Sequence, residues 1–339
     1  MMETKIWQAS ELNQAVKAIK RGALVAFPTE TVYGLGADAF NEAAVGKVYA
    51  AKGRPSDNPL IVHVAEAEQV ERYAIVDARA KQVMDAFWPG PLTIILPAIP
   101  DTVSKTVTGG LTTVASRMPA NDLTRELIRL ADTPLVGPSA NTSGKPSPTT
   151  AQHVFHDLHG KIAGILDDGA TQIGVESTVL DLSVPTPAIL RPGQITPDQI
   201  QAVLGVPVDS EQHHVSATET PKAPGMKYRH YAPDKTVYMV NHADWTQAII
   251  WAQSQLEPVG LMLTNDLIIE HQLAGMDFVW TLGNDGAQAA SKLFAGLRYF
   301  DDRADIQTIL VAALPTTQAN AAYNNRLAKA AGGQFFSAE

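Results

Sequence analysis

The chain has no cysteine, and this absence excludes disulfide bonds, catalytic thiolates and zinc sites built on cysteine. Long hydrophobic runs are also missing: a stretch such as Leu92–Ala98 is too short to cross a bilayer, and residues 1–9 lack the apolar core of a signal peptide. Hydrophobic residues still make up 45% of the 339 residues, which is enough for ordinary globular cores. We therefore expect a cytoplasmic protein without a membrane partner.

Positive charge is scarce as well. Lys and Arg number 26 against 35 Asp and Glu, so the net charge is −9, and residues 236–339 are proportionally the most acidic part. Proteins that hold nucleic acid by its phosphates need a clear positive stripe. We expect at most a weak contact with tRNA or double-stranded RNA, and any anion site should lie before residue 236.

Strand and helix patterns alternate along most of the chain, which predicts an α/β fold. Residues 1–206 carry the longer series and form one predicted domain. Residues 236–339 show four strand patterns with amphipathic helices between and after them, which indicates a smaller parallel α/β domain. The stretch 207–235 is rich in proline, but within it Ala223–Pro233 holds two tyrosines and three basic residues if His230 is counted. That content is typical of a functional loop and not of a spacer.

Three polar loops follow predicted strands, where ligands of open α/β sheets bind. Loop 28–36 (PTETVYGLG) has two threonines and a tyrosine beside two glycines. Loop 137–150 is dense in hydroxyl side chains and could form a backbone nest around phosphate oxygens. A plain turn would explain either loop. Neither a P-loop nor a full dinucleotide fingerprint occurs, and Ser139 lacks the G-x-S-x-G context of a hydrolase nucleophile.

The remaining loop, 52–63, has the sequence KGRPSDNPLIVH. Lys52 and Arg54 lie at the end of a predicted helix, where the helix dipole favours cations whatever their function. Two prolines stiffen the segment around Asn58 and would hold these polar groups in fixed positions. His63 lies in an apolar strand, and most such histidines are structural.

Order and spacing carry more weight than any single loop. PTETVYGLG at 28–36 is followed by K-x-R-P-x-x-N-P-L-x-V-H from Lys52, T-x-x-x-R-x-P from Thr113, PSAN-x-SG from Pro138, ESTV from Glu176 and RPG from Arg191. This series of six motifs over about 165 residues resembles the YrdC domain. With HYAP at 230–233 and the second α/β domain, nearly the whole chain is similar to the long, two-domain form of the threonylcarbamoyl-AMP synthase family.

The resemblance implies a nucleotidyltransferase that makes threonylcarbamoyl-AMP and pyrophosphate from L-threonine, bicarbonate and ATP. The product would pass to the tRNA threonylcarbamoyl transferase machinery, which forms N6-threonylcarbamoyladenosine (t6A) at position 37 of tRNAs reading ANN codons. The implied fold is a twisted, mixed-sheet YrdC-like domain over 1–206 and a Rossmann-like parallel α/β domain over 236–339. Residues 207–235 would join them as a linker and active-site lid.

The resemblance also assigns site residues. The four hallmark residues of the family, taken as catalytic, correspond to Lys52, Arg54, Ser139 and Asn141. ATP contacts would come from Arg54, Asn58, Thr113, Ser139, Ser147, Arg191 and Tyr231, and threonine contacts from Thr31, His63, Arg117, Gly137 and Ser177. Mg²⁺ would be held by the triphosphate and water, so no dedicated metal-binding side chains are expected.

The implied chemistry needs charge neutralisation and a dry site, because the carbamate formed from threonine is unstable in water. We expect Arg117 to pair with the threonine carboxylate. Residues 223–233 could fold over the mouth of the active site, with Tyr231 on the nucleotide and Lys227 or Arg229 near phosphate.

Two other functions fit parts of the pattern. A YrdC-type fold could act as an RNA-binding maturation factor, which the acidic charge balance disfavours. Carbamoyl transfer in hydrogenase maturation uses a related domain, but together with cysteine-rich zinc modules that this sequence lacks. The spacing His153-x-x-His156-x-x-His159 drifts around a helix, so we expect a solvated face there and not a metal site.

Overall fold

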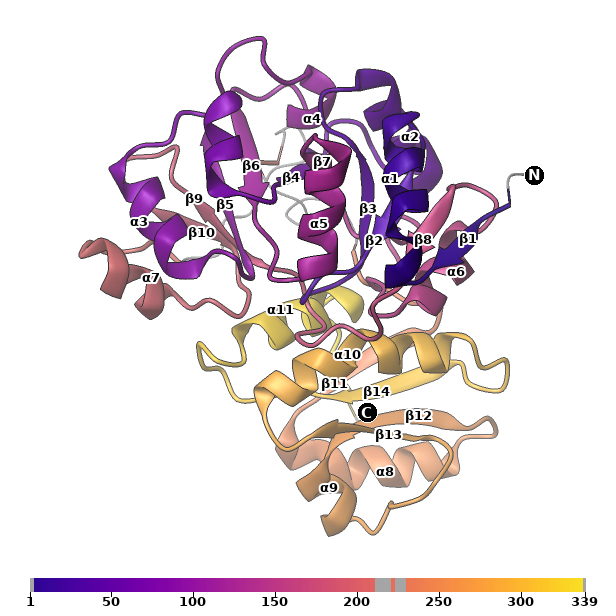
Figure 1. Ribbon diagram of the computed structural model, residues 1–339. Helices are drawn as coiled ribbons and strands as arrows, with labels where there is room; N and C mark the ends of the chain where they lie inside the picture. Colours follow the sequence, from indigo (N-terminus) through magenta and orange to yellow (C-terminus); the bar gives the residue numbers. More distant parts are fainter. Residues whose placement is uncertain (1–2, 211–220, 223–229, 338–339) are drawn as a thin grey trace. The chain divides into compact units, whose positions relative to one another are not determined.

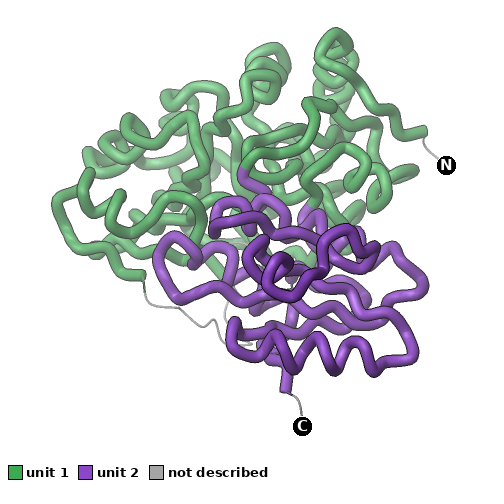
Figure 2. The backbone as a smooth tube through the Cα atoms, turned by 90° about the horizontal axis from the view of Figure 1, so that it is seen from below, with its two compact units in different colours: residues 1–143, 148–172, 176–228 green, residues 144–147, 173–175, 229–339 purple. Residues whose placement is uncertain are grey.

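A computed structural model describes residues 3–210, 221–222 and 230–337. By their internal contacts the residues group into two compact units (Figure 2). The first unit comprises residues 1–143, 148–172 and 176–228, and the second comprises 144–147, 173–175 and 229–339. The second unit therefore includes two short segments from the middle of the chain.

The first unit is built on a mixed sheet (Figure 1). Within the described residues, its ten strands run in the order β1-β8-β2-β3-β7-β4-β6-β5-β9-β10. The strands are β1 (Lys5–Trp7), β2 (Val25–Phe27), β3 (Gly34–Asp38), β4 (Ile61–His63), β5 (Leu92–Pro97), β6 (Thr113–Arg117), β7 (Leu135–Val136), β8 (Gly164–Leu166), β9 (Thr178–Asp181) and β10 (Ala188–Arg191). Strands β4 and β6 pair in parallel and β2 and β3 antiparallel, which confirms the predicted mixed sheet.

Helices pack on this sheet. They are α1 (Leu12–Lys20), α2 (Glu42–Lys52), α3 (Ala78–Phe87), α4 (Lys105–Thr108), α5 (Asp122–Ala131), α6 (Ala151–Leu158) and α7 (Pro197–Leu204), and α1 lies beside α5 (Figure 1). The Asn41 side chain accepts the N–H of Ala44 at the start of α2, and Gly53 ends that helix at φ 63°. Alternate residues of β2 enter different core clusters, Ala26 one and Phe27 the other, so the sheet is buried on both faces.

The second unit holds a smaller parallel sheet. Its described strands, β11 (Thr236–Val240), β12 (Val259–Thr264), β13 (Val279–Gly283) and β14 (Thr308–Ala312), run in the order β11-β14-β12-β13, and every pair is parallel. The helices are α8 (Trp245–Ser254), α9 (Asn265–Glu270), α10 (Gly286–Asp301) and α11 (Ala321–Ala330). This arrangement confirms the predicted small α/β domain. None of the helices described in either unit is both long and apolar enough to cross a bilayer.

The sequence suggests that the glycines of PTETVYGLG serve a turn, but the structure gives them another role. Strand β3 begins at Gly34, inside the predicted loop. A Cβ at Gly34 would lie 2.7 Å from Cζ of Phe27, and one at Gly36 would lie 2.8 Å from the carbonyl oxygen of Val25. Both glycines therefore serve the close approach of β3 to β2. Strand β1 and helix α5 are further elements that the sequence patterns do not reveal.

Candidate active site

Two neighbouring strands carry residues that are expected to bind threonine. The register of the parallel pair β4 and β6 places His63 opposite Arg117. The Arg117 guanidinium donates from Nη1 to Oγ1 of Thr31 at 2.8 Å and from Nε to the carbonyl of Gly90 at 3.2 Å. Thr31 lies in the turn after β2, where its N–H donates to Oγ1 of Thr29 at 3.1 Å. The fold thus brings Thr31, His63 and Arg117 together.

His63 is a neutral imidazole. Burial, followed by the nearby charge of Arg117, lowers the pKa of His63 to about 3. Its ring meets the ring of Phe27 edge-on, with 5.3 Å between the centroids. A Cβ at Gly137 would come within 2.6 Å of His63 Nδ1. The backbone at Gly137, a predicted threonine contact, therefore lies close to the His63 ring. Nδ1 itself is buried without a hydrogen-bond partner among the described residues.

The fold adds one residue that the motif assignments do not include. Glu30 Oε2 lies 2.7 Å from Arg117 Nη2, and the two side chains are 8% and 4% exposed. The contact lacks the alignment of a hydrogen bond, so both Glu30 oxygens and Arg117 Nη2 have no such bond within the described part of the chain. This buried ion pair therefore keeps unused hydrogen-bonding capacity. The signal in the sequence is the position of Glu30 between two threonines of the PTETVYGLG motif.

Three of the four predicted catalytic residues meet at the end of α2. The Lys52 ammonium donates to the carbonyls of Ser139 and Asn141, the latter at 2.7 Å, and to Oδ1 of Asn141 at 3.4 Å. Ser139 Oγ donates to the same Oδ1 at 2.6 Å. The segment that carries them extends the sheet, because the N–H of Gly137 donates to the carbonyl of Ile61 at 2.9 Å. Lys52, which is 2% exposed, thus holds the backbone of the predicted phosphate loop.

The fourth predicted catalytic residue, Arg54, binds its own loop. Its Nε donates to the carbonyl of Asn58 at 3.3 Å and its Nη2 to the carbonyl of Pro59 at 3.0 Å. Arg54 is 9% exposed and Asn58 is 1% exposed. Oδ1 of Asn58 is buried, with no hydrogen-bond partner in the described residues. The loop therefore fixes a cation and retains an unused amide oxygen.

A further buried cation lies where β9 and β10 pair. Arg191 donates from Nη2 to Oγ of Ser177 at 3.1 Å and from Nε to the Ser177 carbonyl at 3.1 Å. Ser177 Oγ also shares a hydrogen bond of 2.8 Å with Oγ1 of Thr93. Thr113 is placed differently: it opens β6, whose last residue is Arg117, so the two lie at opposite ends of one strand.

The tip of the predicted phosphate loop, residues 144–147, belongs to the second unit. Within that unit, Lys145 Nζ lies 2.5 Å from a carboxylate oxygen of Asp234 and 3.1 Å from one of Asp301. Burial works against the charge of Lys145, but the two aspartates more than offset it and raise the pKa of the ammonium. Arg298 donates from Nη2 to the carbonyl of Pro146 at 2.6 Å. We call this set of contacts the loop clamp.

Ser147 and Tyr231, two of the predicted ATP contacts, also lie in the second unit. Ser147 is fully buried and Tyr231 is 4% exposed. The Tyr231 ring stacks on Phe294 with 5.2 Å between centroids, and the guanidinium carbon of Arg326 lies 5.7 Å from the ring centroid. Tyr231 adopts φ 66°, in the left-handed region.

Lys227 and Arg229, the cations expected in the lid, lie outside the described residues. Two of the three spaced histidines have local partners: His156 Nδ1 is 3.0 Å from a carboxylate oxygen of Asp157, and the ring of His159 stacks on Phe155. Among the described residues, no group of three or more His, Asp or Glu side chains could hold a metal ion.

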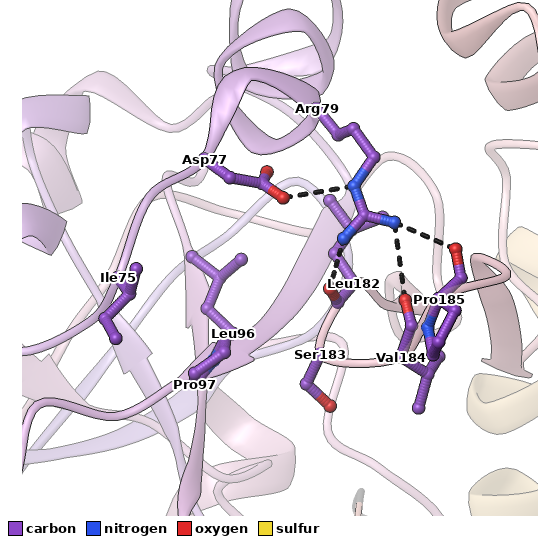
Figure 3. Close-up of a pocket in the computed structure, with 9 residues that line it drawn as sticks. All are labelled: Ile75, Asp77, Arg79, Leu96, Pro97, Leu182, Ser183, Val184 and Pro185. Atoms are coloured by element: carbon purple, nitrogen blue, oxygen red, sulfur yellow. Dashed lines mark hydrogen bonds and ion pairs between the residues drawn. The ribbon is translucent and has the colours of Figure 1, made fainter.

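A cavity of about 290 Å³ in the first unit is a competing candidate site (Figure 3). It is lined by Ile75, Asp77, Arg79, Leu96, Pro97, Leu182, Ser183, Val184 and Pro185. The Arg79 guanidinium crosses one side, where it bonds to the Asp77 carboxylate and to the carbonyls of Leu182, Val184 and Pro185 (Figure 3). Because these protein groups use its donors, and because no lining residue belongs to the predicted site, we read the cavity as structural.

Comparison with known proteins shows the family. Residues 17–193 match the family model described as "Telomere recombination", and residues 195–332 match "Threonylcarbamoyl-AMP synthase, C-terminal domain". The threonylcarbamoyl-AMP synthase of Bacillus subtilis is 46% identical over 329 residues, which cover 96% of this chain and 94% of that protein. The chain belongs to the threonylcarbamoyl-AMP synthase family. Another family member, from Pyrococcus abyssi, is 43% identical over 321 residues, which cover 93% of this chain and 92% of that protein.

A solved structure extends the likeness to the fold. The crystal structure of the family member Sua5 from P. abyssi, complexed with L-threonine, matches with a TM-score of 0.87 and 40% sequence identity. The match covers 99% of this chain and 98% of that one. The resemblance to threonylcarbamoyl-AMP synthases that six short motifs indicated is therefore confirmed.

Proposed function

We propose that this protein is a nucleotidyltransferase that forms threonylcarbamoyl-AMP and pyrophosphate from L-threonine, bicarbonate and ATP. One observation carries the proposal. His63, Arg117 and Asn58, three residues expected to bind the substrates, each bury a polar atom that has no hydrogen-bond partner among the described residues. Such atoms are costly in an empty fold, and polar substrates that meet them would recover that cost.

For the threonine end, we assign Thr31, His63, Arg117, Gly137 and Ser177. The Arg117 guanidinium would take the α-carboxylate, and a charge-assisted hydrogen bond of this kind contributes about 1.5–3 kcal/mol. His63 is neutral, so it offers hydrogen bonding to the substrate without adding a second positive charge. Its burial also supports a site that excludes water, which the carbamate intermediate requires.

For the nucleotide end, we assign Arg54, Asn58, Thr113, Ser139, Ser147, Arg191 and Tyr231. In the transfer step a carbamate oxygen forms a bond to the α-phosphorus, and the bond from that phosphorus to pyrophosphate breaks. Lys52, Arg54 and Arg191 would neutralise the charge that develops, while Lys52 and Asn141 keep the phosphate loop in place. We propose that Mg²⁺ arrives with ATP and is bound by phosphate and water.

The product is a reactive mixed anhydride, so it needs a prompt acceptor. We propose that it passes to the tRNA threonylcarbamoyl transferase machinery, which uses it to form t6A at position 37 of tRNAs that read ANN codons. A cytoplasmic location belongs to the same proposal, since tRNA and ATP meet there.

The test is the release of pyrophosphate from ATP, measured with and without L-threonine and bicarbonate. We expect turnover to require both. Lys52→Ala should lower turnover about 10²-fold, because the substitution removes a buried charge and the three hydrogen bonds that hold the loop. Lys81→Ala is the matched control, since the Lys81 side chain is 61% exposed and pairs with Glu71. Turnover that ignores threonine, or that survives Lys52→Ala undiminished, would contradict the proposal.

A further inference from the structure

We propose that Glu30 receives the α-ammonium group of the amino acid substrate and takes the first proton that this group loses. The inference rests on the proposed function. Glu30 is buried beside Arg117, with 2.7 Å between Oε2 and Nη2, and neither Glu30 oxygen has an aligned hydrogen-bond donor in the described part of the chain. A buried carboxylate that accepts no hydrogen bond is expensive, so this position calls for an occupant that donates.

Charge complementarity identifies that occupant. A free amino acid is a zwitterion, whose carboxylate needs donors and whose ammonium group needs acceptors. Arg117 uses Nε on the carbonyl of Gly90 and Nη1 on Thr31, while Nη2 has no aligned acceptor among the described residues and can take a carboxylate oxygen. Glu30 supplies the acceptor next to it. His63, opposite Arg117 in the sheet, is neutral and does not compete for either charge.

The same carboxylate is suited to start the reaction. One N–H bond of the ammonium group breaks, and its proton goes to Glu30. The freed electron pair of the nitrogen forms a bond to the carbon of bicarbonate. A C–O bond then breaks, and the hydroxide leaves as water with a second proton from the nitrogen. The carbamate keeps the third proton on nitrogen, and Glu30 returns its proton to solvent. General-base help of this kind contributes about 10²–10⁴-fold to a rate.

The alternative is that Glu30 only neutralises Arg117 in the empty protein. The two roles predict opposite effects on ligand binding. If Glu30 is only a counter-ion, removing its charge frees Arg117, and every carboxylate ligand should bind more tightly. If Glu30 receives the ammonium group, removing its charge should weaken only those ligands that carry this group.

The experiment compares L-threonine with 2,3-dihydroxybutanoate, in which a hydroxyl group replaces the ammonium group. Binding to the full chain is measured by calorimetry for the wild type, Glu30→Gln and Glu66→Gln. Glu66 is 50% exposed and pairs with Arg129, so this control makes the same chemical change at the surface. We expect Glu30→Gln to weaken threonine about tenfold or more while the analogue binds as before or more tightly, and Glu66→Gln to alter neither.

Turnover supplies the second readout. At saturating threonine, Glu30→Gln should lower kcat about 10²-fold. If that variant fails to fold, Glu30→Asp keeps the charge but withdraws the carboxylate from the ammonium group, and it should lower kcat and weaken threonine while the analogue binds as before. An equal loss for both ligands, unchanged threonine binding, or an undiminished kcat would overturn the role of Glu30. A wild type without threonine-dependent turnover would instead defeat the proposed function, so the two failures are distinguishable.

Discussion

The buried imidazole of His63 should make the protein sensitive to acid. Burial and the charge of Arg117 lower the pKa of His63 to about 3, whereas a histidine in the unfolded chain titrates near about 6.5. Between these two pH values the His63 side chain binds a proton in the unfolded chain but not in the folded protein. The free energy of unfolding therefore falls as the pH drops below about 6.5, and above that pH His63 contributes no pH dependence.

The size of the effect follows from the same two values. At pH 5, about 1.5 pH units below the pKa of the unfolded state, His63 alone should have cost about 2 kcal/mol of stability. His63→Asn puts a polar group that does not titrate in the same place. The free energy of unfolding of this variant at neutral pH can differ from that of the wild type, but it should not show the part of the fall at acid pH that is due to His63.

The assay is urea unfolding at pH 7.5 and pH 5.0, followed by intrinsic fluorescence. Between the two conditions the wild type should lose about 2 kcal/mol more than His63→Asn, and contributions from carboxylates cancel in this difference. His242→Asn is the control, because the His242 side chain is 69% exposed, and it should lose as much as the wild type. The same acid loss in His63→Asn and wild type would refute the neutral, buried imidazole.

Three further outcomes test other parts of the structure. Gly137→Ala should raise the KM for threonine and cost about 1–3 kcal/mol in thermal unfolding, because its Cβ would meet His63 Nδ1 at 2.6 Å; an unchanged KM would contradict that close approach. A double-mutant cycle of Lys145→Gln and Asp301→Asn should show about 1 kcal/mol of coupling, since the side chains are only 28% and 13% exposed, and zero coupling would remove the ion pair from the loop clamp. Arg79→Met should destabilise the protein by about 1–2 kcal/mol and leave both substrate KM values unchanged, because its donors serve protein groups; a shifted KM would count against a structural cavity.

Most of the fold could be predicted from local signals. Helix α2 begins at the side-chain cap of Asn41 and ends at Gly53, as the sequence suggests, because capping depends on residues close in the chain. Strand β3 escaped prediction because Gly34 and Gly36 are poor strand formers in isolation. These two positions need glycine because the ring of Phe27 on the neighbouring strand leaves no room for a Cβ. This contact is tertiary, so the local sequence does not reveal it.

The sequence predicts which residues belong to the candidate site better than it predicts how they are arranged. Lys52 and Arg54 could be placed at a helix end, but their bonds to loop carbonyls depend on how the chain returns to them. The alignment of His63 with Arg117 is a property of strand register, which a single sequence does not encode locally. The role of Glu30 is not predictable from the sequence, because its burial against Arg117 exists only in the folded state.

The loop clamp limits what a truncated form of the protein can show about the second unit. Residues 144–147 are encoded in the N-terminal half of the gene, yet Lys145 and Pro146 find their partners Asp301 and Arg298 near the other end. A shortened chain that stops at residue 206 would delete those partners and leave the loop tip behind without them. Loss of activity in such a truncation would therefore not assign any chemical step to the second unit. Coexpression of the two halves as separate polypeptides, with recovery of activity on reassembly, would distinguish structural support of the loop tip from a chemical role of the second unit.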